Sequence, residues 1–219
     1  NKDRKYIILN SQEQLSKKSL KNFSNLIKRR KKSEPIAYLI NKKEFWNHTF
    51  YIDCNVLIPR PDTEILVEET LKLFSKSSKL RMLDIGTGSG CILLSILKER
   101  RNFLGIGIDI SKNAIKVANF NAKLQQLSNR VKFYKSDVDK FLIGKYDIVL
   151  SNPPYIKERD LKYLEKDIVD FEPKTALDGG RDGFLKITKV ISKASKLVKK
   201  NGRFILEIGF DQKNKTIDI

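Results

Sequence analysis

The chain has 219 residues, of which 40% are hydrophobic, so it can bury one sizeable core and carry a small accessory segment. Its formal net charge of +18 indicates attraction to polyanions or acidic partners. Thirteen Lys and Arg residues, against four acidic ones, lie in residues 1–45. This basic region is either a docking face for RNA or an acidic protein, or a surface that is simply rich in lysine.

The rarer side chains exclude several classes of protein. Two isolated cysteines, Cys54 and Cys91, and a single histidine, His48, are too few for a disulfide framework or a zinc site. We therefore expect a protein of a reducing compartment, the cytoplasm, without a metal. No stretch approaches the roughly 18 uncharged apolar residues of a transmembrane helix. We expect no signal peptide before the chain. It begins with Asn1, so we expect it to be incomplete or trimmed there.

Residues 1–42 are predicted to form a small helical domain. Apolar residues recur at helical spacing among lysines over Ser11–Arg30, which indicates an amphipathic helix, and a shorter helical segment follows at Pro35–Leu39. Residues 43–61 are predicted to be a linker that contains a two-stranded hairpin over Phe45–Leu57. Aromatic and β-branched residues punctuated by asparagine are typical of such a hairpin.

Residues 62–219 are predicted to form an α/β domain, because strand and helix patterns alternate along them. The expected strands are Leu80–Ile85, Phe103–Asp109, Val131–Tyr134, Tyr146–Leu150 and Phe204–Ile208, and the expected helices are Ile65–Phe74, Cys91–Lys98, Asn113–Leu124 and Phe184–Val198. This alternation predicts a parallel, Rossmann-like sheet covered by helices on both faces. Ligands bind to such sheets outside the carboxyl ends of the strands.

A glycine-rich turn follows the first of these strands in the sequence LDIGTGSGC, where Asp84 closes the strand. Glycines allow positive φ and let a ligand approach the backbone. The spacing G-x-G-x-G is one residue shorter than the dinucleotide fingerprint, and no Gly-Lys-Ser/Thr follows, so a phosphate site is disfavoured. The turn residues are candidates for cofactor binding: Gly86, Thr87, Gly88, Ser89 and Gly90.

Acidic residues follow the next two strands. Asp109 ends the sequence GIGID, where a carboxylate can accept both hydroxyls of a ribose. Asp137 and Val138 follow the third strand in KSDVDKF, in reach of an adenine amino group. Each feature alone has a plainer interpretation, since a strand-end aspartate is often only a helix cap. Together, with an amino-acid moiety over the glycine turn, they describe a site for S-adenosylmethionine.

The fourth strand is followed by the sequence NPPY. Proline donates no backbone hydrogen bond, so Pro153 and Pro154 end strand pairing and stiffen the loop, and a rigid turn is the plain interpretation. Beside a methyl donor, however, the Asn152 side-chain oxygen and the Pro153 carbonyl could accept both hydrogens of a planar NH₂ group. Tyr155 would then pack on that group. We therefore predict that Asn152, Pro153 and Tyr155 are catalytic and that all four residues bind the substrate.

Four segments together carry a resemblance: LIPRPDTE, LDIGTGSG, SNPPYI and FEPKTALDGGRDG. The chain resembles, over roughly residues 10 to 210, the release factor glutamine methyltransferases, the family called PrmC or HemK. The resemblance implies a class I S-adenosylmethionine-dependent methyltransferase that N5-methylates the glutamine of the Gly-Gly-Gln motif in class 1 peptide chain release factors. It further implies that the catalytic domain continues past the fifth strand into a helix and an antiparallel strand pair.

The resemblance also implies roles for particular residues. Asn152 would contact the cofactor as well as the substrate. Val138 stands where family members often carry an aromatic residue. Arg60 and Pro61 would shape the pocket floor, with an ordinary helix N-cap at Asp62 or Thr63 as the plainer interpretation of this segment. The residues of the last segment would form a closing loop, namely Glu172, Gly179, Gly180 and Gly183.

Two other functions remain open from the sequence. NPPY and the charge of +18 are also typical of an N6-adenine methyltransferase acting on DNA or RNA, although no target-recognition domain is evident in this length. A truncated cofactor-binding or RNA-binding module without turnover is the third alternative. In each case the basic N-terminal region is a candidate contact for nucleic acid or the ribosome, and no membrane contact is expected.

Overall fold

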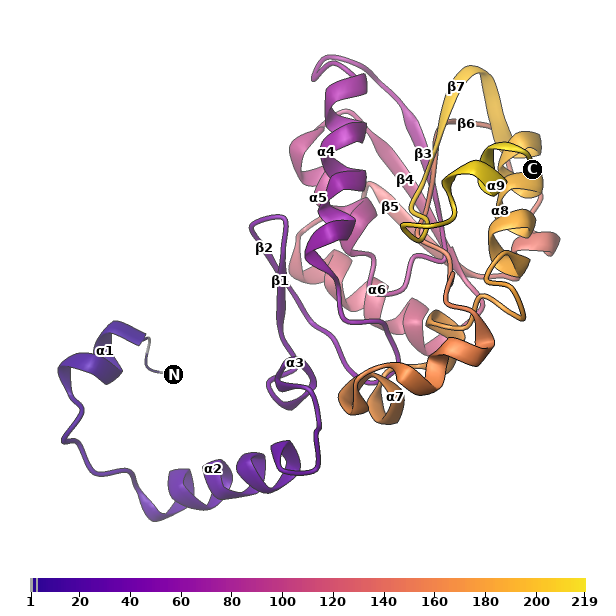
Figure 1. The fold of residues 1–219 in the computed structure, drawn as a ribbon. Coiled ribbons are helices and arrows are strands. Elements are labelled where there is room, and N and C mark those ends of the chain that lie inside the picture. The colour runs from indigo at the N-terminus through magenta and orange to yellow at the C-terminus, as the bar shows by residue number, and fades with distance from the viewer. Residues whose placement is uncertain (1, 3) are drawn as a thin grey trace.

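The computed structural model describes residues 2 and 4–219. The N-terminal part contains α1 (Arg4–Leu9), α2 (Lys17–Arg30) and the short α3 (Ile36–Leu39), and Figure 1 shows α1 and α2 reaching away from the sheet. The predicted helix from Ser11 was wrong at its start. The hydroxyl of Ser16 accepts a hydrogen bond from the Ser19 N–H at 3.2 Å, which caps α2 and ends the irregular segment before it.

The hairpin is shorter than predicted. Strands β1 (Lys43–Phe45) and β2 (His48–Phe50) pair antiparallel around Trp46 and Asn47, whose φ angles of 49° and 57° define a tight turn of the type that matches strand twist. Pairing stops after Phe50 because the backbone N–H and C=O of Tyr51 bond instead to the side-chain amide of Asn121, at 2.8 and 2.9 Å. Residues 51–60 therefore run across the domain as an extended segment.

The predicted parallel sheet is confirmed. Its strands are β3 (Arg81–Ile85), β4 (Leu104–Asp109), β5 (Val131–Lys135), β6 (Tyr146–Ser151) and β7 (Val198–Leu206), in the order β5-β4-β3-β6-β7, and all pairs are parallel. The last strand begins earlier than predicted. Its register against β6 jumps between Tyr146 and Ile148, where Asn201 takes a positive φ of 64° beside Gly202.

Helices cover both faces of the sheet. On one side lie α4 (Glu64–Leu73), α5 (Cys91–Glu99) and α6 (Lys112–Leu124), and on the other lies α8 (Leu185–Leu197), as Figure 1 shows. The first side buries Leu93 and Ile96 of α5 with Phe45 and Phe50 of the hairpin, and the second buries Val190 of α8 against the strands. The short α7 (Lys166–Phe171) and α9 (Lys213–Ile217) complete the chain.

Thr63 stands at the N-cap position of α4, one of the two positions named in the plainer interpretation, but its side chain makes no capping hydrogen bond. A 3₁₀ turn, η1 (Pro61–Thr63), precedes the helix. Thr63 is buried and turned toward the carboxyl edge of the sheet, so its hydroxyl is used elsewhere. Within the part of the chain that the structure describes, no helix is long and apolar enough to cross a membrane.

Candidate active site

A cavity of about 500 Å³ lies at the carboxyl edge of the sheet, where β3, β4 and β6 end. The extended segment after β2 and residues 173–178 complete its wall. Its lining includes ten of the predicted site residues: Gly86, Thr87, Gly88, Ser89, Asp109, Asp137, Val138, Asn152, Pro153 and Pro154. The tertiary fold thus brings together in one hollow residues from four strand ends, those of β3, β4, β5 and β6, as expected for this sheet topology.

The glycine turn is shaped for close approach from the cavity. Gly86 and Gly88 have φ angles of 76° and 53°, and a Cβ atom on either would meet no heavy atom within 4 Å, so both face open space. Gly90 differs, because its Cβ would come within 3.2 Å of Leu94 and Phe133 in the core. That packing explains why Gly90, although predicted to bind the cofactor, is not among the residues lining the cavity.

Asp84, at the end of β3, binds the glycine turn through Thr87. Its Oδ2 accepts a hydrogen bond from the Thr87 hydroxyl at 2.6 Å, while its Oδ1 is buried without a hydrogen-bond partner. The residue is fully buried, and burial raises the pKa of its carboxyl to about 7. A carboxyl in this position ties the turn to the end of β3.

Asp109 joins the ends of β3 and β4. Its Oδ2 accepts from the Gly88 N–H at 3.0 Å and its Oδ1 accepts from the Ser111 N–H at 2.8 Å. Burial raises the pKa of this carboxyl, and the backbone donors offset part of that shift. A carboxylate offers about four acceptor sites, so acceptor capacity remains beside these backbone donors. A ribose hydroxyl fits this remaining capacity.

The third strand end supplies a polar and an apolar side chain. Asp137 caps a short 3₁₀ turn, η2 (Val138–Lys140), by accepting from the Asp139 N–H at 3.0 Å, and it lines the cavity. Val138 lines the same wall, together with Ile110, which is 58% exposed and was not predicted. An apolar residue directly after the strand-end aspartate was the signal for Ile110. These aliphatic side chains, with Asp137, fit a flat base that carries an amino group.

The NPPY loop places its first three residues on the cavity wall. The Asn152 amide nitrogen donates to the Thr63 hydroxyl at 3.1 Å, which leaves the amide oxygen available to a ligand. Pro153 is buried at the same wall. Tyr155 lies beside the wall and not in it, with its hydroxyl 3.5 Å from Oε1 of Glu207. Its predicted packing on the substrate stays a prediction.

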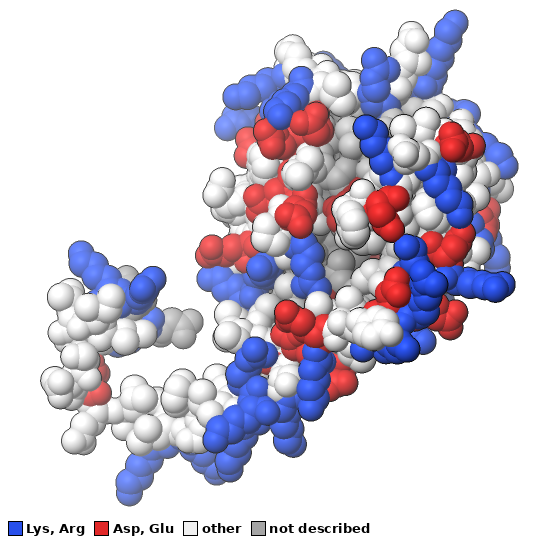
Figure 2. Space-filling model, in the orientation of Figure 1, with Lys and Arg blue, Asp and Glu red and all other residues white. Residues whose placement is uncertain are grey.

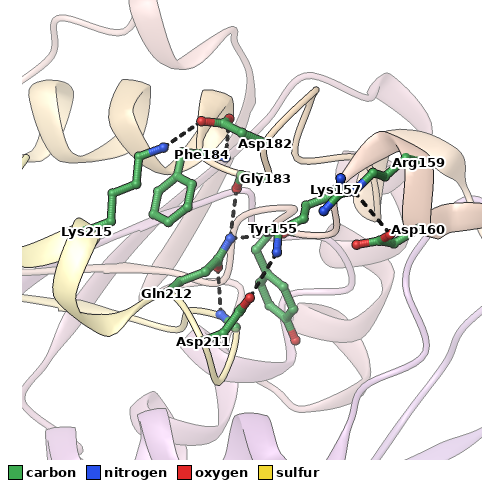
Figure 3. Close-up of polar contacts among 11 residues, drawn as sticks. Tyr155, Lys157, Arg159, Asp160, Asp182, Gly183, Phe184, Asp211, Gln212 and Lys215 are labelled. Carbon is green, nitrogen blue, oxygen red and sulfur yellow. Dashed lines mark hydrogen bonds and ion pairs between the residues drawn. The ribbon is translucent and has the colours of Figure 1, made fainter.

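The segment predicted as a closing loop packs directly on NPPY. Ile156 forms a parallel bridge with Asp178, and a Cβ on Gly179 would lie 2.8 Å from the Tyr155 backbone, which explains this glycine. In Figure 3 the side chain of Gln212 links this region: it donates to the carbonyls of Tyr155 and Gly183, both at 3.2 Å, and accepts from Gly209 at 2.8 Å. The buried side-chain amide of Gln212 therefore fixes the loop around Tyr155 on the side away from the cavity.

Glu172 connects the opposite wall to the extended segment. Its buried carboxylate accepts from the Ile58 N–H at 3.1 Å and forms an ion pair with Arg60, which lines the cavity. Pro61, predicted to share the pocket floor with Arg60, is exposed, begins the turn before α4 and is not part of the lining.

Sequence reasoning missed Thr63, which lines the cavity, and Glu207, which lies next to Tyr155 behind the wall. Glu207 comes directly after β7, so the acidic residue ending the apolar run FIL was an available signal. Thr63 carried no such signal. Among the residues that the structure describes, no group of three or more His, Cys, Asp or Glu side chains is arranged to hold a metal ion.

A parallel sheet of this order, with a glycine turn and an acidic residue at successive strand ends around one cavity, defines a class I methyltransferase. The model of the methyltransferase domain family matches residues 76–214, and that of the PrmC N-terminal domain matches residues 1–40. A ribosomal protein L11 methylase from Lactobacillus delbrueckii subsp. bulgaricus has a similar fold, with a TM-score of 0.51 and 19% identity over 73% of this chain and 67% of that one.

Closer relatives narrow the class to one family. The chain is 40% identical to the release factor glutamine methyltransferase of Clostridium acetobutylicum, over 100% of this chain and 78% of the relative. It is 42% identical to that of Buchnera aphidicola subsp. Schizaphis graminum, over 95% and 75%. The chain belongs to the release factor glutamine methyltransferase family. Its cofactor is S-adenosylmethionine, which the residues of the cavity fit.

Proposed function

We propose that this protein transfers a methyl group from S-adenosylmethionine to the side-chain nitrogen of the glutamine in the Gly-Gly-Gln motif of a class 1 peptide chain release factor. One observation carries the proposal. The Asn152 amide nitrogen is engaged by Thr63, so its oxygen is left for a ligand in the cavity, next to the Pro153 carbonyl. Two acceptors at this edge suit a planar NH₂ group.

The weakness of the nucleophile explains why acceptors are needed. An amide nitrogen delocalises its lone pair into the carbonyl, so little electron density points toward the methyl group. S-adenosylmethionine supplies that methyl group on a positively charged sulfur. Asn152 and Pro153 would hold both N–H bonds, which orients the nitrogen and favours the positive charge that develops on it. A new N–C bond forms as the S–C bond breaks, and the nitrogen then releases one proton.

The rigidity of the loop supports this role. Pro153 and Pro154 fix their φ angles and offer no N–H that could compete for the acceptors. Gln212 holds the Tyr155 carbonyl from behind. An acceptor pair on a stiff loop is preorganised, which is the condition under which such groups lower a barrier most.

The basic N-terminal region, residues 1–45, is proposed to make an accessory contact with a partner, and its helices α1 and α2 form an arm. Figure 2 shows Lys and Arg side chains gathered along this arm and at its junction with the rest of the molecule. They include the run Lys28–Lys32 at the end of α2. Such a surface suits weak, salt-dependent contact with an acidic release factor, RNA or the ribosome. Because translation termination takes place in the cytoplasm, we propose that the protein acts there.

Methylation assays with labelled cofactor test this function. S-adenosylmethionine carrying a tritiated methyl group is offered with a release factor, with its Gln→Ala variant at the Gly-Gly-Gln motif, and with DNA and RNA. Label is expected on the unmodified release factor alone. Label on nucleic acid would instead favour an adenine N6-methyltransferase. Cofactor binding without label on any substrate would favour a module without turnover.

A further inference from the structure

A partly buried carboxylate lies behind the acceptor group and has no role in the chemistry described above. Glu207 comes directly after β7, and Asn152 comes directly after β6. These strands are parallel neighbours, with Leu206 opposite Ser151, and the Glu207 N–H donates to the Ser151 carbonyl at 3.0 Å. The two side chains therefore start from adjacent positions at the same edge of the sheet.

Two polar neighbours of Glu207, Thr63 and Asn152, line the cavity. Its Oε1 lies 3.5 Å from the Tyr155 hydroxyl, and its Oε2 is buried with free acceptor capacity. Burial raises the pKa of this carboxyl, while hydrogen bonding from Thr63, Asn152 and Tyr155 lowers it and the negative charge of Asp62 raises it. The Thr63 hydroxyl also accepts a hydrogen bond from the Asn152 amide nitrogen at 3.1 Å, so Thr63 contacts both the carboxylate and the amide.

The chemistry of these groups decides which way the amide faces. An asparagine side chain has a donor end and an acceptor end of nearly equal size. A hydroxyl both donates and accepts, so Thr63 alone could pair with either end. An ionised carboxylate only accepts. Beside Glu207, the Thr63 hydroxyl therefore directs its hydrogen to the carboxylate and its lone pair to Asn152, and the amide must present its NH₂ end.

We propose that Glu207 is a positioning residue that acts on the Asn152 amide, directly and through Thr63, and holds it with its oxygen toward the substrate glutamine. The inference rests on the proposed function and deepens it, because it names what orients the acceptor. Protonated Glu207 becomes a donor as well, so the orientation is lost as the pH falls through its pKa. The groups facing it are Asp62 on η1 and Tyr155 on the NPPY loop.

Four variants test this role in the methylation assay. Glu207→Gln keeps the shape of the side chain but replaces a carboxylate, which only accepts hydrogen bonds, by an amide that also donates them. Thr63→Val keeps the shape of the side chain but removes its hydroxyl. Both are expected to lower kcat by roughly tenfold or more, by analogy with the partners that orient metal ligands, with KM for S-adenosylmethionine little changed. Thr63→Ser is expected to restore most of the activity. Asp211→Asn, a change in the same turn that removes an exposed ion pair to Lys157, is the matched control.

The pH profile separates positioning from a purely structural loss. In the unmodified protein, kcat is expected to decrease as the pH is lowered. In Glu207→Gln this decrease in kcat at acidic pH is expected to be absent. Equal kcat for the unmodified protein and Glu207→Gln would overturn the proposal, as would the same decrease at acidic pH in both.

A second measurement does not depend on the release factor being the substrate. The ¹⁵N–¹H signals of the Asn152 NH₂ group, identified by their loss in Asn152→Asp, are followed between pH 5 and 8. They are expected to shift with pH in the unmodified protein and in Asp211→Asn, and to be insensitive in Glu207→Gln. Insensitivity in the unmodified protein would overturn the positioning role even where methylation is observed. Absence of methylation with this pH response present would reject the proposed function alone.

Discussion

Arg60 and Glu172 are 112 residues apart in the chain, yet their side chains form an ion pair that joins the extended segment to the segment after α7. The Glu172 side chain is 1% exposed and that of Arg60 is 33% exposed. The carboxylate thus depends on Arg60 and the Ile58 N–H for the charge compensation that water would otherwise give.

Removing Arg60 is therefore expected to destabilise the protein. Arg60→Ala should lower the free energy of unfolding by about 3 kcal/mol, because it leaves a buried carboxylate without its counter-ion. Urea denaturation measures this change. Arg159→Ala, which breaks an exposed pair with Asp160, is the control and should cost less than about 1 kcal/mol. Equal decreases in the free energy of unfolding of the two variants would show that the buried ion pair contributes no more to stability than the exposed one.

Asn152→Ala is expected to lower turnover by on the order of 10² or more, by analogy with the loss of one preorganised polar group. Folding should persist, since Asn152 is only partly buried. Single-turnover methylation, with cofactor binding measured separately by calorimetry, tests this expectation. Near-normal turnover with the cofactor bound would remove Asn152 from the mechanism.

Asp109→Ala is expected to weaken S-adenosylmethionine binding by roughly 100-fold or more. Hydrogen bonds to a charged group contribute about 1.5–3 kcal/mol each, and the variant would lose those to the ribose. Calorimetric titration with the cofactor gives the dissociation constant. Asp139→Asn is the control, because that side chain is exposed and pairs with Lys189. Similar affinity in both variants would contradict the assignment of Asp109.

Asp84 is expected to make stability depend on pH. Its carboxyl has a pKa of about 7 in the folded protein, against an ordinary value of 3.8. Between these values the folded state holds a proton that the unfolded chain has lost, so this stabilising contribution is present at low pH and disappears as the pH rises to about 7. The loss amounts to about 1.4 kcal/mol for each pH unit.

Asp84→Asn should abolish that dependence while keeping an acceptor for Thr87. Relative to the unmodified protein, the variant is expected to gain about 2–3 kcal/mol of stability between pH 5 and pH 8. Urea denaturation at four pH values measures the difference. An unchanged pH dependence in Asp84→Asn would show that another group is responsible.

Gln212→Ala is expected to destabilise the loop behind Tyr155. The change leaves three backbone groups without their partner, and each buried unsatisfied group costs about 1–3 kcal/mol. Hydrogen exchange at the Gly209 amide, which loses its acceptor, should become faster, and methylation should decrease. Asn214→Ala, on the exposed side of α9, is the control. Unaltered exchange in Gln212→Ala would show that the loop does not need this amide.

Much of the sheet and half of the site could be predicted because their signals are local. The central strands β3, β4 and β6 are mostly apolar and lead into Gly86, Asp109 and Asn152, and each βα turn brings its own strand end to the same edge of a parallel sheet. The positions of Asp109 and Asn152 on the cavity wall follow from this rule. The errors lie where the chain departs from regular periodicity, as at Ser16, Tyr51 and the interrupted β7, where a single side chain or a register change ends an element.

The sequence by itself determined the class of fold and the glycine and aspartate residues that line the cavity, because those features are encoded within short segments. Only the tertiary structure decided which side chains contact Asn152, namely Thr63 and Glu207. Thr63 lies 89 residues before it, and Glu207 lies 52 residues beyond Tyr155. They meet there because β6 and β7 are neighbours and the turn before α4 crosses their ends. Such contacts depend on strand order and side-chain packing, which no local pattern specifies.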